Sequence, residues 1–257
     1  MIQKMLSAGI GICLFTGLAF TMEISSNAEA VNIAGKQRMF TQRMLKDYAM
    51  IGMKNTFGKP DVDLKKVIDN FDSSSKALLT YTKNDAIKES IKKIQALWEP
   101  LKKTLSEEAS VEKVGQLQED LEALLKAAND TTKLFEKESK NASGTVVNMA
   151  GRQRMLSQRM AGLYMLKVWG INDPKFKDKM DQTMTLFKTS LAELEKSKLN
   201  TDEISKLLAK VKRSFMFFEM MNKSKSKFVP TLIYKKSNDI LTNMNTATQG
   251  YVALETK

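Results

Sequence analysis

Apolar residues recur every three to four positions along most of the chain after residue 30, with charged and polar residues between them. This spacing predicts amphipathic α-helices that each turn one face toward a core. Breaks in the pattern divide the chain into two sets of four helices. The expected ranges are 31–57, 62–82, 85–105, 111–141, 144–171, 174–198, 201–226 and 229–255.

Glycine, proline and small polar residues mark the ends of these helices. The expected N-caps, whose side chains accept hydrogen bonds from the first free N–H groups, are Asp61, Ser110 and Thr201. Pro174 and Pro230 suit a first helical turn. Pro100 falls inside a helical pattern, so we expect it to kink or split its helix. Gly144 is a weak break, which leaves open one continuous helix across the fourth and fifth ranges.

One motif occurs twice, at a constant offset of 116 residues: Asn32–Met44 reads NIAGKQRMFTQRM and Asn148–Met160 reads NMAGRQRMLSQRM. Weaker matches pair Phe71 with Phe187, Trp98 with Phe215 and Asn129-Asp130 with Asn238-Asp239. Such self-similarity indicates a duplicated unit. We therefore predict an all-α protein of two tandem up-down four-helix bundles, residues 31–143 and 144–257, related by a pseudo-twofold axis.

Residues 1–30 have the layout of a secretory signal peptide. A short basic start with Lys4 precedes an almost wholly apolar run at 6–21, and Ala28-Glu29-Ala30 forms a small-x-small cleavage pattern. The alternative is an uncleaved membrane anchor, although the run is slightly short for a membrane span. Both interpretations place the remaining chain outside the cytoplasm, and we predict a periplasmic protein.

Composition excludes several classes of chemistry. The chain has no histidine, and Cys13, its only cysteine, lies in the apolar run. The predicted mature chain therefore lacks ligands for zinc, copper, iron–sulfur clusters or His-ligated haem, and lacks the groups for Ser-His or Cys-His catalysis. We predict no cofactor, no metal and no enzymatic activity. The net charge of +12 comes mostly from dispersed lysines, so we also predict no nucleic-acid partner.

Arginine is concentrated in the motif, whose two copies hold five of the six arginines. A planar guanidinium can grip a planar oxyanion through two parallel hydrogen bonds, which an ammonium cannot do. On a helix the motif presents one polar seam opposite its apolar stripe, made of Gly35, Arg38 and Gln42 in the first copy and Gly151, Arg154 and Gln158 in the second.

This seam predicts that the two motif helices pack against each other, with Arg38 facing Arg154. Two desolvated guanidinium groups repel, so we expect a small anion between them. The alternative is that both arginines bond helix carbonyls or carboxylates and only fix the packing of the bundle.

The motif Asn-x-Ala-Gly-x-x-Arg-Met-x-x-x-Arg resembles the N-terminal sensor segment of PilJ-type domains and the P-box of NarX-type nitrate and nitrite sensors. The resemblance implies a four-helix bundle that binds nitrate or nitrite through one arginine of each motif helix, here Arg38 and Arg154. The full set of predicted ligand-binding residues is Arg38, Arg154, Gly35, Gly151, Ala34, Ala150, Gln42, Gln158, Arg43 and Arg159.

The chain departs from such receptors because it has no kinase, HAMP or methyl-accepting region. The resemblance then implies a separate partner, a membrane-bound sensor histidine kinase or chemoreceptor, to which this protein reports a bound anion. The alternative is a helical adaptor that pairs with a PilJ-like membrane partner and binds no ligand.

Overall fold

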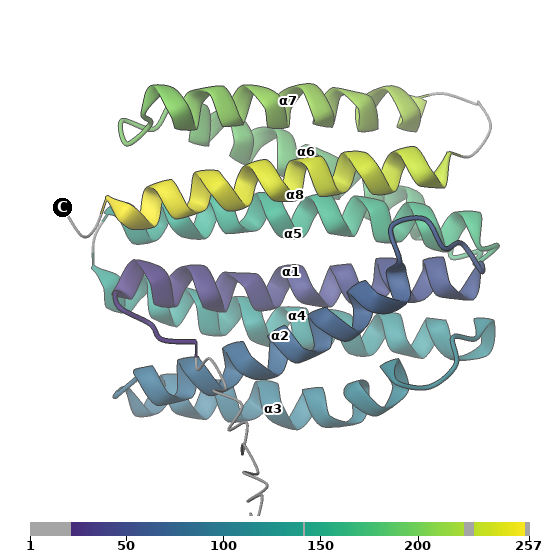
Figure 1. Cartoon of the computed structure of the whole chain (residues 1–257), viewed down its shortest axis with the longest axis horizontal. Coiled ribbons are helices and arrows are strands. Elements are labelled where there is room, and N and C mark those ends of the chain that lie inside the picture. The colour runs from purple at the N-terminus through teal and green to yellow at the C-terminus, as the bar shows by residue number, and fades with distance from the viewer. Residues whose placement is uncertain (1–21, 141, 224–228, 255–257) are drawn as a thin grey trace, which may run out of the picture.

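A computed structural model describes residues 22–140, 142–223 and 229–254 (Figure 1). These residues form eight helices and no strand. The all-α prediction is thus confirmed. The helices are α1 (Asn27–Gly52), α2 (Pro60–Tyr81), α3 (Asp85–Leu105), α4 (Val111–Ser139), α5 (Ala142–Val168), α6 (Phe176–Glu195), α7 (Asp202–Lys223) and α8 (Pro230–Ala253). Within the described part of the chain, no helix is long and apolar enough to cross a membrane.

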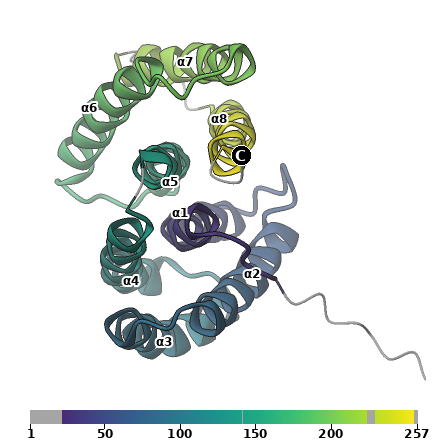
Figure 2. The same ribbon diagram turned by 90° about the vertical axis from the view of Figure 1, so that its left-hand side faces the viewer.

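The two motif helices, α1 and α5, lie side by side at the centre of the molecule (Figure 2). Helix α1 also packs on α2 and α4, and α5 packs on α6 and α8. The remaining helices cover the outside, with α3 on α4 and α7 on α8. The same packing order occurs in both halves; the pseudo-twofold axis between them stays a prediction.

The central and outer helices differ in how much of their surface is buried. Helix α3 buries one apolar stripe, which includes Ile87, Ile91 and Ile94. Helix α1 is buried on nearly every side, and its buried set includes the polar Arg38 and Lys46. A helix enclosed by several others has no solvent face, so its polar residues must find partners inside the bundle.

Contacts in the core confirm the weak repeat beyond the motif. The rings of Phe71 and Trp98 lie 4.5 Å apart in the first half, and those of Phe187 and Phe215 lie 4.4 Å apart in the second. These are the pairs that the sequence offsets match. The sequence repeat therefore extends beyond the motif to these aromatic pairs of the core.

Several predicted helix ends are confirmed, and others are wrong. The side chains of Ser110 and Thr201 accept from the N–H groups of Lys113 and Ile204, as expected of N-caps. Pro230 begins α8. Asp61 is not an N-cap, because α2 begins one residue earlier at Pro60 and its N-cap is Lys59.

The expectation for Pro174 is wrong, and the structure answers part of what was left open for Pro100 and for the link between the halves. Pro174 precedes α6, which begins at Phe176, rather than lying in its first turn. Pro100 lies inside α3 and does not split it, and the kink stays a prediction. Helices α4 and α5 are separate, because Lys140 adopts a left-handed conformation with φ of 52° that ends α4.

The predicted signal peptide, residues 1–30, overlaps the start of α1. Residues 1–21, which hold its apolar run, lie outside the described residues. Ser26 caps α1 by accepting from the N–H of Glu29 at 3.1 Å, and Ala28 and Ala30 are buried in the first turn. Cleavage after Ala30 would remove this cap and turn. The signal peptide and the periplasmic location stay predictions.

Candidate functional site

Arg38 of α1 and Arg154 of α5 lie in the interior where the two central helices pack. Their exposed fractions are 0% and 1%. Arg38 Nη2 donates to the main-chain oxygen of Asn148 on α5 at 3.2 Å, and Arg154 Nη2 donates to that of Asn32 on α1 at 3.4 Å. Each arginine therefore reaches across to the first residue of the other copy of the motif.

An asparagine from a neighbouring helix holds the second terminal nitrogen of each arginine. Arg38 Nη1 donates to Asn129 Oδ1 on α4, and Arg154 Nη1 donates to Asn245 Oδ1 on α8, both at 3.0 Å. The sequence match of Asn129 with Asn238 was therefore wrong. The true counterpart is Asn245, which lies at the motif's own offset of 116. Applying that single offset throughout would have found both asparagines.

Gly35 and Gly151 leave room for the two arginine tips. A Cβ on Gly35 would lie 3.1 Å from Arg38 Nη2 and 3.7 Å from Arg154 Nη2. A Cβ on Gly151 would lie 3.1 Å from Arg154 Nη2 and 3.2 Å from Arg38 Nη2. Both guanidinium groups thus meet beside both glycines, as the polar seam predicted. The alanine before each glycine is fully buried: Ala34 and Ala150.

The interior around the two arginines is electrostatically unfavourable. Burial, together with the charges of Arg152 and Arg154, lowers the pKa of Arg38 from 12.5 to about 9, although Glu136 acts in the opposite direction. Burial lowers the pKa of Arg154 to about 10. Burial and the charge of Arg154 also lower the pKa of Lys36. Both arginines stay charged at neutral pH, so the fold holds two adjacent buried cations.

Hydrogen bonding leaves one edge of each buried guanidinium incomplete. The bonds of Arg38 and Arg154 within the described residues go to neutral oxygens, and none goes to a carboxylate. The Nε atoms of both have no partner among those residues. Arg43 uses the corresponding edge fully, since its Nε and Nη2 both donate to the carboxylate of Asp63. The Nε and Nη2 edge of each buried arginine can likewise donate to a planar oxyanion.

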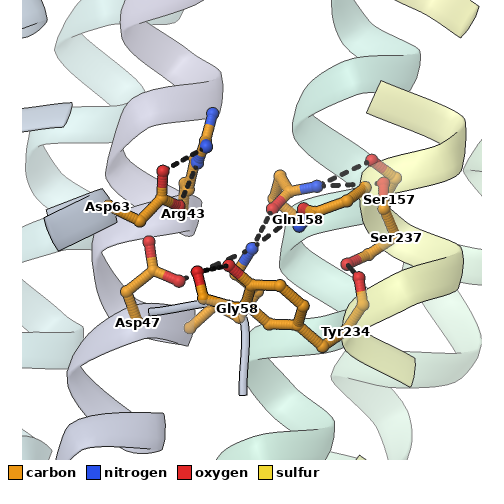
Figure 3. Close-up of polar contacts among 10 residues, drawn as sticks. Arg43, Asp47, Gly58, Asp63, Ser157, Gln158, Tyr234 and Ser237 are labelled. Carbon is orange, nitrogen blue, oxygen red and sulfur yellow. Dashed lines mark hydrogen bonds and ion pairs between the residues drawn. The ribbon is translucent and has the colours of Figure 1, made fainter. Parts of the chain in front are cut away.

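The other two predicted arginines of the site form ion pairs elsewhere. Arg43 faces Asp63 of α2 (Figure 3), and this contact raises the pKa of Arg43 despite its burial. Arg159 Nη1 lies 2.8 Å from Glu122 Oε2 of α4. The structure therefore does not bring these two side chains together with the buried pair, and their part in ligand binding stays a prediction.

Gln42 and Gln158 lie one helical turn beyond the arginines. Gln42 Nε2 donates to Thr41 Oγ1 at 3.3 Å, and Gln158 Nε2 donates to the main-chain oxygen of Ser237 at 3.1 Å (Figure 3). Gln158 Oε1 accepts from Lys46 Nζ at 2.9 Å. Both amides thus have partners apart from the arginine tips.

Sequence reasoning missed a second buried polar cluster, formed around Lys46 and Asp47 of α1, which are both fully buried. Lys46 Nζ bonds Asn238 Oδ1 at 3.1 Å, lies 4.2 Å from the centre of the Tyr234 ring and lies 3.6 Å from Asp47 Oδ1. Burial, reinforced by the neighbouring Asp63, raises the pKa of Asp47 to about 8. Among the described residues, no group of acidic, histidine or cysteine side chains is placed to hold a metal ion.

Comparison with known proteins gives one match. The family model described as the N-terminal region of type IV pili methyl-accepting chemotaxis transducers, PilJ, matches residues 21–131 and 137–215. Each matched segment contains one copy of the arginine motif. No curated protein and no solved structure matches the chain. Because the family model covers most of the chain in two segments, the protein belongs to the PilJ family of signal-transducer domains.

Proposed function

We propose that this protein is a periplasmic sensor that binds one nitrate or nitrite ion between α1 and α5 and reports it to a membrane signalling partner. The observation that carries the proposal is the pair of buried arginines, Arg38 and Arg154, which have no carboxylate partner and no partner for Nε within the part of the chain that the structure describes. A buried cation needs a compensating anion, and two forked cations favour one that is small and planar.

The energetics support binding in the micromolar range. Each charge-assisted hydrogen bond contributes roughly 1.5–3 kcal/mol. Three or four such bonds, less the costs of desolvation and ordering, leave on the order of −8 kcal/mol, which corresponds to about micromolar affinity. Since the tips of both arginines lie beside the same two glycines, one ion can contact both, and we expect one ion per chain.

Nitrate and nitrite are the proposed ligands because they match the geometry and the resemblance of the motif to NarX-type sensors. Both are planar and small, as a site beside Gly35 and Gly151 requires. We expect binding without turnover, since no nucleophile paired with a base lies among the described residues of the site.

Signalling would follow from a population shift. An anion that neutralises the repulsion between Arg38 and Arg154 stabilises the arrangement in which α1 and α5 are closest. The partner that reads this change is a membrane-bound sensor histidine kinase or chemoreceptor. The chemoreceptor is suggested by the family, whose description is that of a methyl-accepting chemotaxis transducer, and the histidine kinase by the resemblance of the motif to NarX-type sensors.

The proposal is tested by thermal melting of the full chain with nitrate, nitrite, sulfate, phosphate, chloride and acetate. At a hundredfold excess over the dissociation constant, binding contributes about 2.7 kcal/mol. For a chain of this size that is a rise in Tm of roughly 5–10 °C. We expect this rise with nitrate or nitrite and its loss in Arg38→Lys and Arg154→Lys, because an ammonium cannot fork. A selective rise with another anion would refute the ligand assignment.

A second function, a helical adaptor without a ligand, is favoured by a different observation. Each buried guanidinium already donates to an asparagine and to a main-chain oxygen, so it also cross-links α1 and α5. An adaptor would show no change in Tm with any of the six anions and would bind a PilJ-like membrane partner without them.

A further inference from the structure

Glu136 of α4 lies at the Arg38 end of the buried arginine pair. Its Oε2 accepts from Asn148 Nδ2 at 2.6 Å, and the main-chain oxygen of the same Asn148 accepts from Arg38 Nη2. Its charge acts on Arg38 directly, since Glu136 is the acidic group that raises the pKa of that arginine against the effects of burial and the other cations. The Arg38 end of the site therefore holds a counter-charge.

Among the described residues, no acidic group acts in this way on Arg154, whose pKa is lowered by burial. The offset of 116 residues relates Asn129 on α4 to Asn245 on α8. By the same offset, the counterpart of Glu136 is Val252. Val252 is buried and apolar. Accordingly, the side chain of Asn32 finds no hydrogen-bond partner among the described residues, whereas that of its counterpart Asn148 bonds Glu136. Each end of the site thus holds one arginine, but the position that is a carboxylate at the Arg38 end is an apolar side chain at the Arg154 end.

We propose that Glu136 sets the affinity of the anion site by competing with the anion for the charge of Arg38. This inference rests on the proposed function. In the ligand-free chain the carboxylate partly compensates the buried cation, which makes the free state more stable. When an oxyanion binds the arginine pair, two negative charges share that cation, and their repulsion weakens binding. Glu136 acts on the anion through the charge of Arg38, since its carboxylate accepts from Asn148.

The asymmetry has a functional consequence. A sensor must release its ligand as the concentration falls, and a site with two uncompensated buried cations would hold an anion too tightly to respond. One internal carboxylate brings the affinity into a working range, while the apolar Val252 leaves the charge of Arg154 fully available to the ligand. The anion is consequently attracted more strongly by Arg154 than by Arg38.

The test is calorimetric titration of nitrate and nitrite into the full wild-type chain, Glu136→Gln and Glu138→Gln. The glutamine at 136 keeps an oxygen that can accept from Asn148 but removes the charge. We expect it to tighten binding on the order of ten-fold at low salt. Glu138→Gln is the matched control, because it removes the same charge two residues away, where the carboxylate accepts from Asn84, the N-cap of α3. Its affinity should stay within about two-fold of wild type.

The direction of the change separates this role from simple support of the fold. If Glu136 only positioned Asn148, its replacement would leave the affinity unchanged or weaken it, and either result would overturn the inference. An equal gain in both variants would also overturn it, because the effect would then be one of overall charge. If no anion binds to wild type or to either variant, the proposed function itself fails.

Discussion

Replacing a buried arginine should stabilise the ligand-free protein. Arg38→Met keeps a long side chain but removes a charge that is disfavoured by burial and by the charges of Arg152 and Arg154. Together these lower the pKa of Arg38 from 12.5 to about 9, a shift that corresponds to roughly 5 kcal/mol. The substitution also removes the hydrogen bonds to Asn129 and to the main chain of Asn148, which costs roughly 1–1.5 kcal/mol each. The expected result is a net gain of about 2 kcal/mol, or roughly 4–8 °C in Tm.

Arg43→Met is the matched control. It removes the same side chain from the same helix, but Arg43 is paired with Asp63 through two nitrogens. Its loss leaves a largely buried carboxylate without a partner, so we expect a loss of roughly 1–3 kcal/mol. The two substitutions should therefore change stability in opposite directions.

The assay is urea unfolding followed by circular dichroism at low salt without added nitrate or nitrite, repeated with a saturating concentration of each. The wild type should gain stability from the anion, whereas Arg38→Met should not. If Arg38→Met is destabilised as much as Arg43→Met in the absence of anion, the buried arginines act as structural cross-links and the electrostatic reasoning is refuted.

Three further predictions concern the surroundings of the site. Gly151→Ala places a Cβ 3.1–3.2 Å from both arginine tips and should abolish the anion-induced rise in Tm, whereas Gly115→Ala, whose Cβ meets nothing within 4 Å, should only add about 0.5–1 kcal/mol of stability. Asn129→Ala and Asn245→Ala should each cost roughly 1–3 kcal/mol in urea unfolding, because each removes the acceptor of one buried arginine, and no loss from either would contradict these hydrogen bonds. Asp47 has a folded pKa of about 8, above its ordinary 3.8, so the fold favours its neutral form: unfolding free energy should fall as pH rises from about 4 to above 8, and Asp47→Asn should remove that slope. An identical pH slope in Asp47→Asn and wild type would contradict the assignment.

The helices and the central contact could be predicted from the sequence because both leave a periodic signal. Apolar spacing located all eight helices, and the duplicated motif brought Arg38 opposite Arg154. Both depend on the spacing of residues along one helix, which can be read directly from the sequence. The ends of the helices were less predictable, since Lys59 begins α2 from a left-handed conformation that no capping rule suggests.

The partners of the buried polar groups could not be predicted, because they come from other helices. A lysine and an aspartate at adjacent positions, such as Lys46 and Asp47, are typical of a solvated surface. They are buried here because α1 is enclosed by other helices. Gln42 shares a seam with Arg38 but lies four residues further on, about 6 Å along the helix, which is enough to give it different partners.

The most direct test of the central claim is calorimetric titration of nitrate and of nitrite into the full chain, beside the double variant Arg38→Met/Arg154→Met. The account predicts saturable heat for at least one of the two ions, with one ion bound per chain and about micromolar affinity, and no heat from the double variant. Binding that is unchanged in the folded double variant would contradict it, as would the absence of heat from both ions in the wild type.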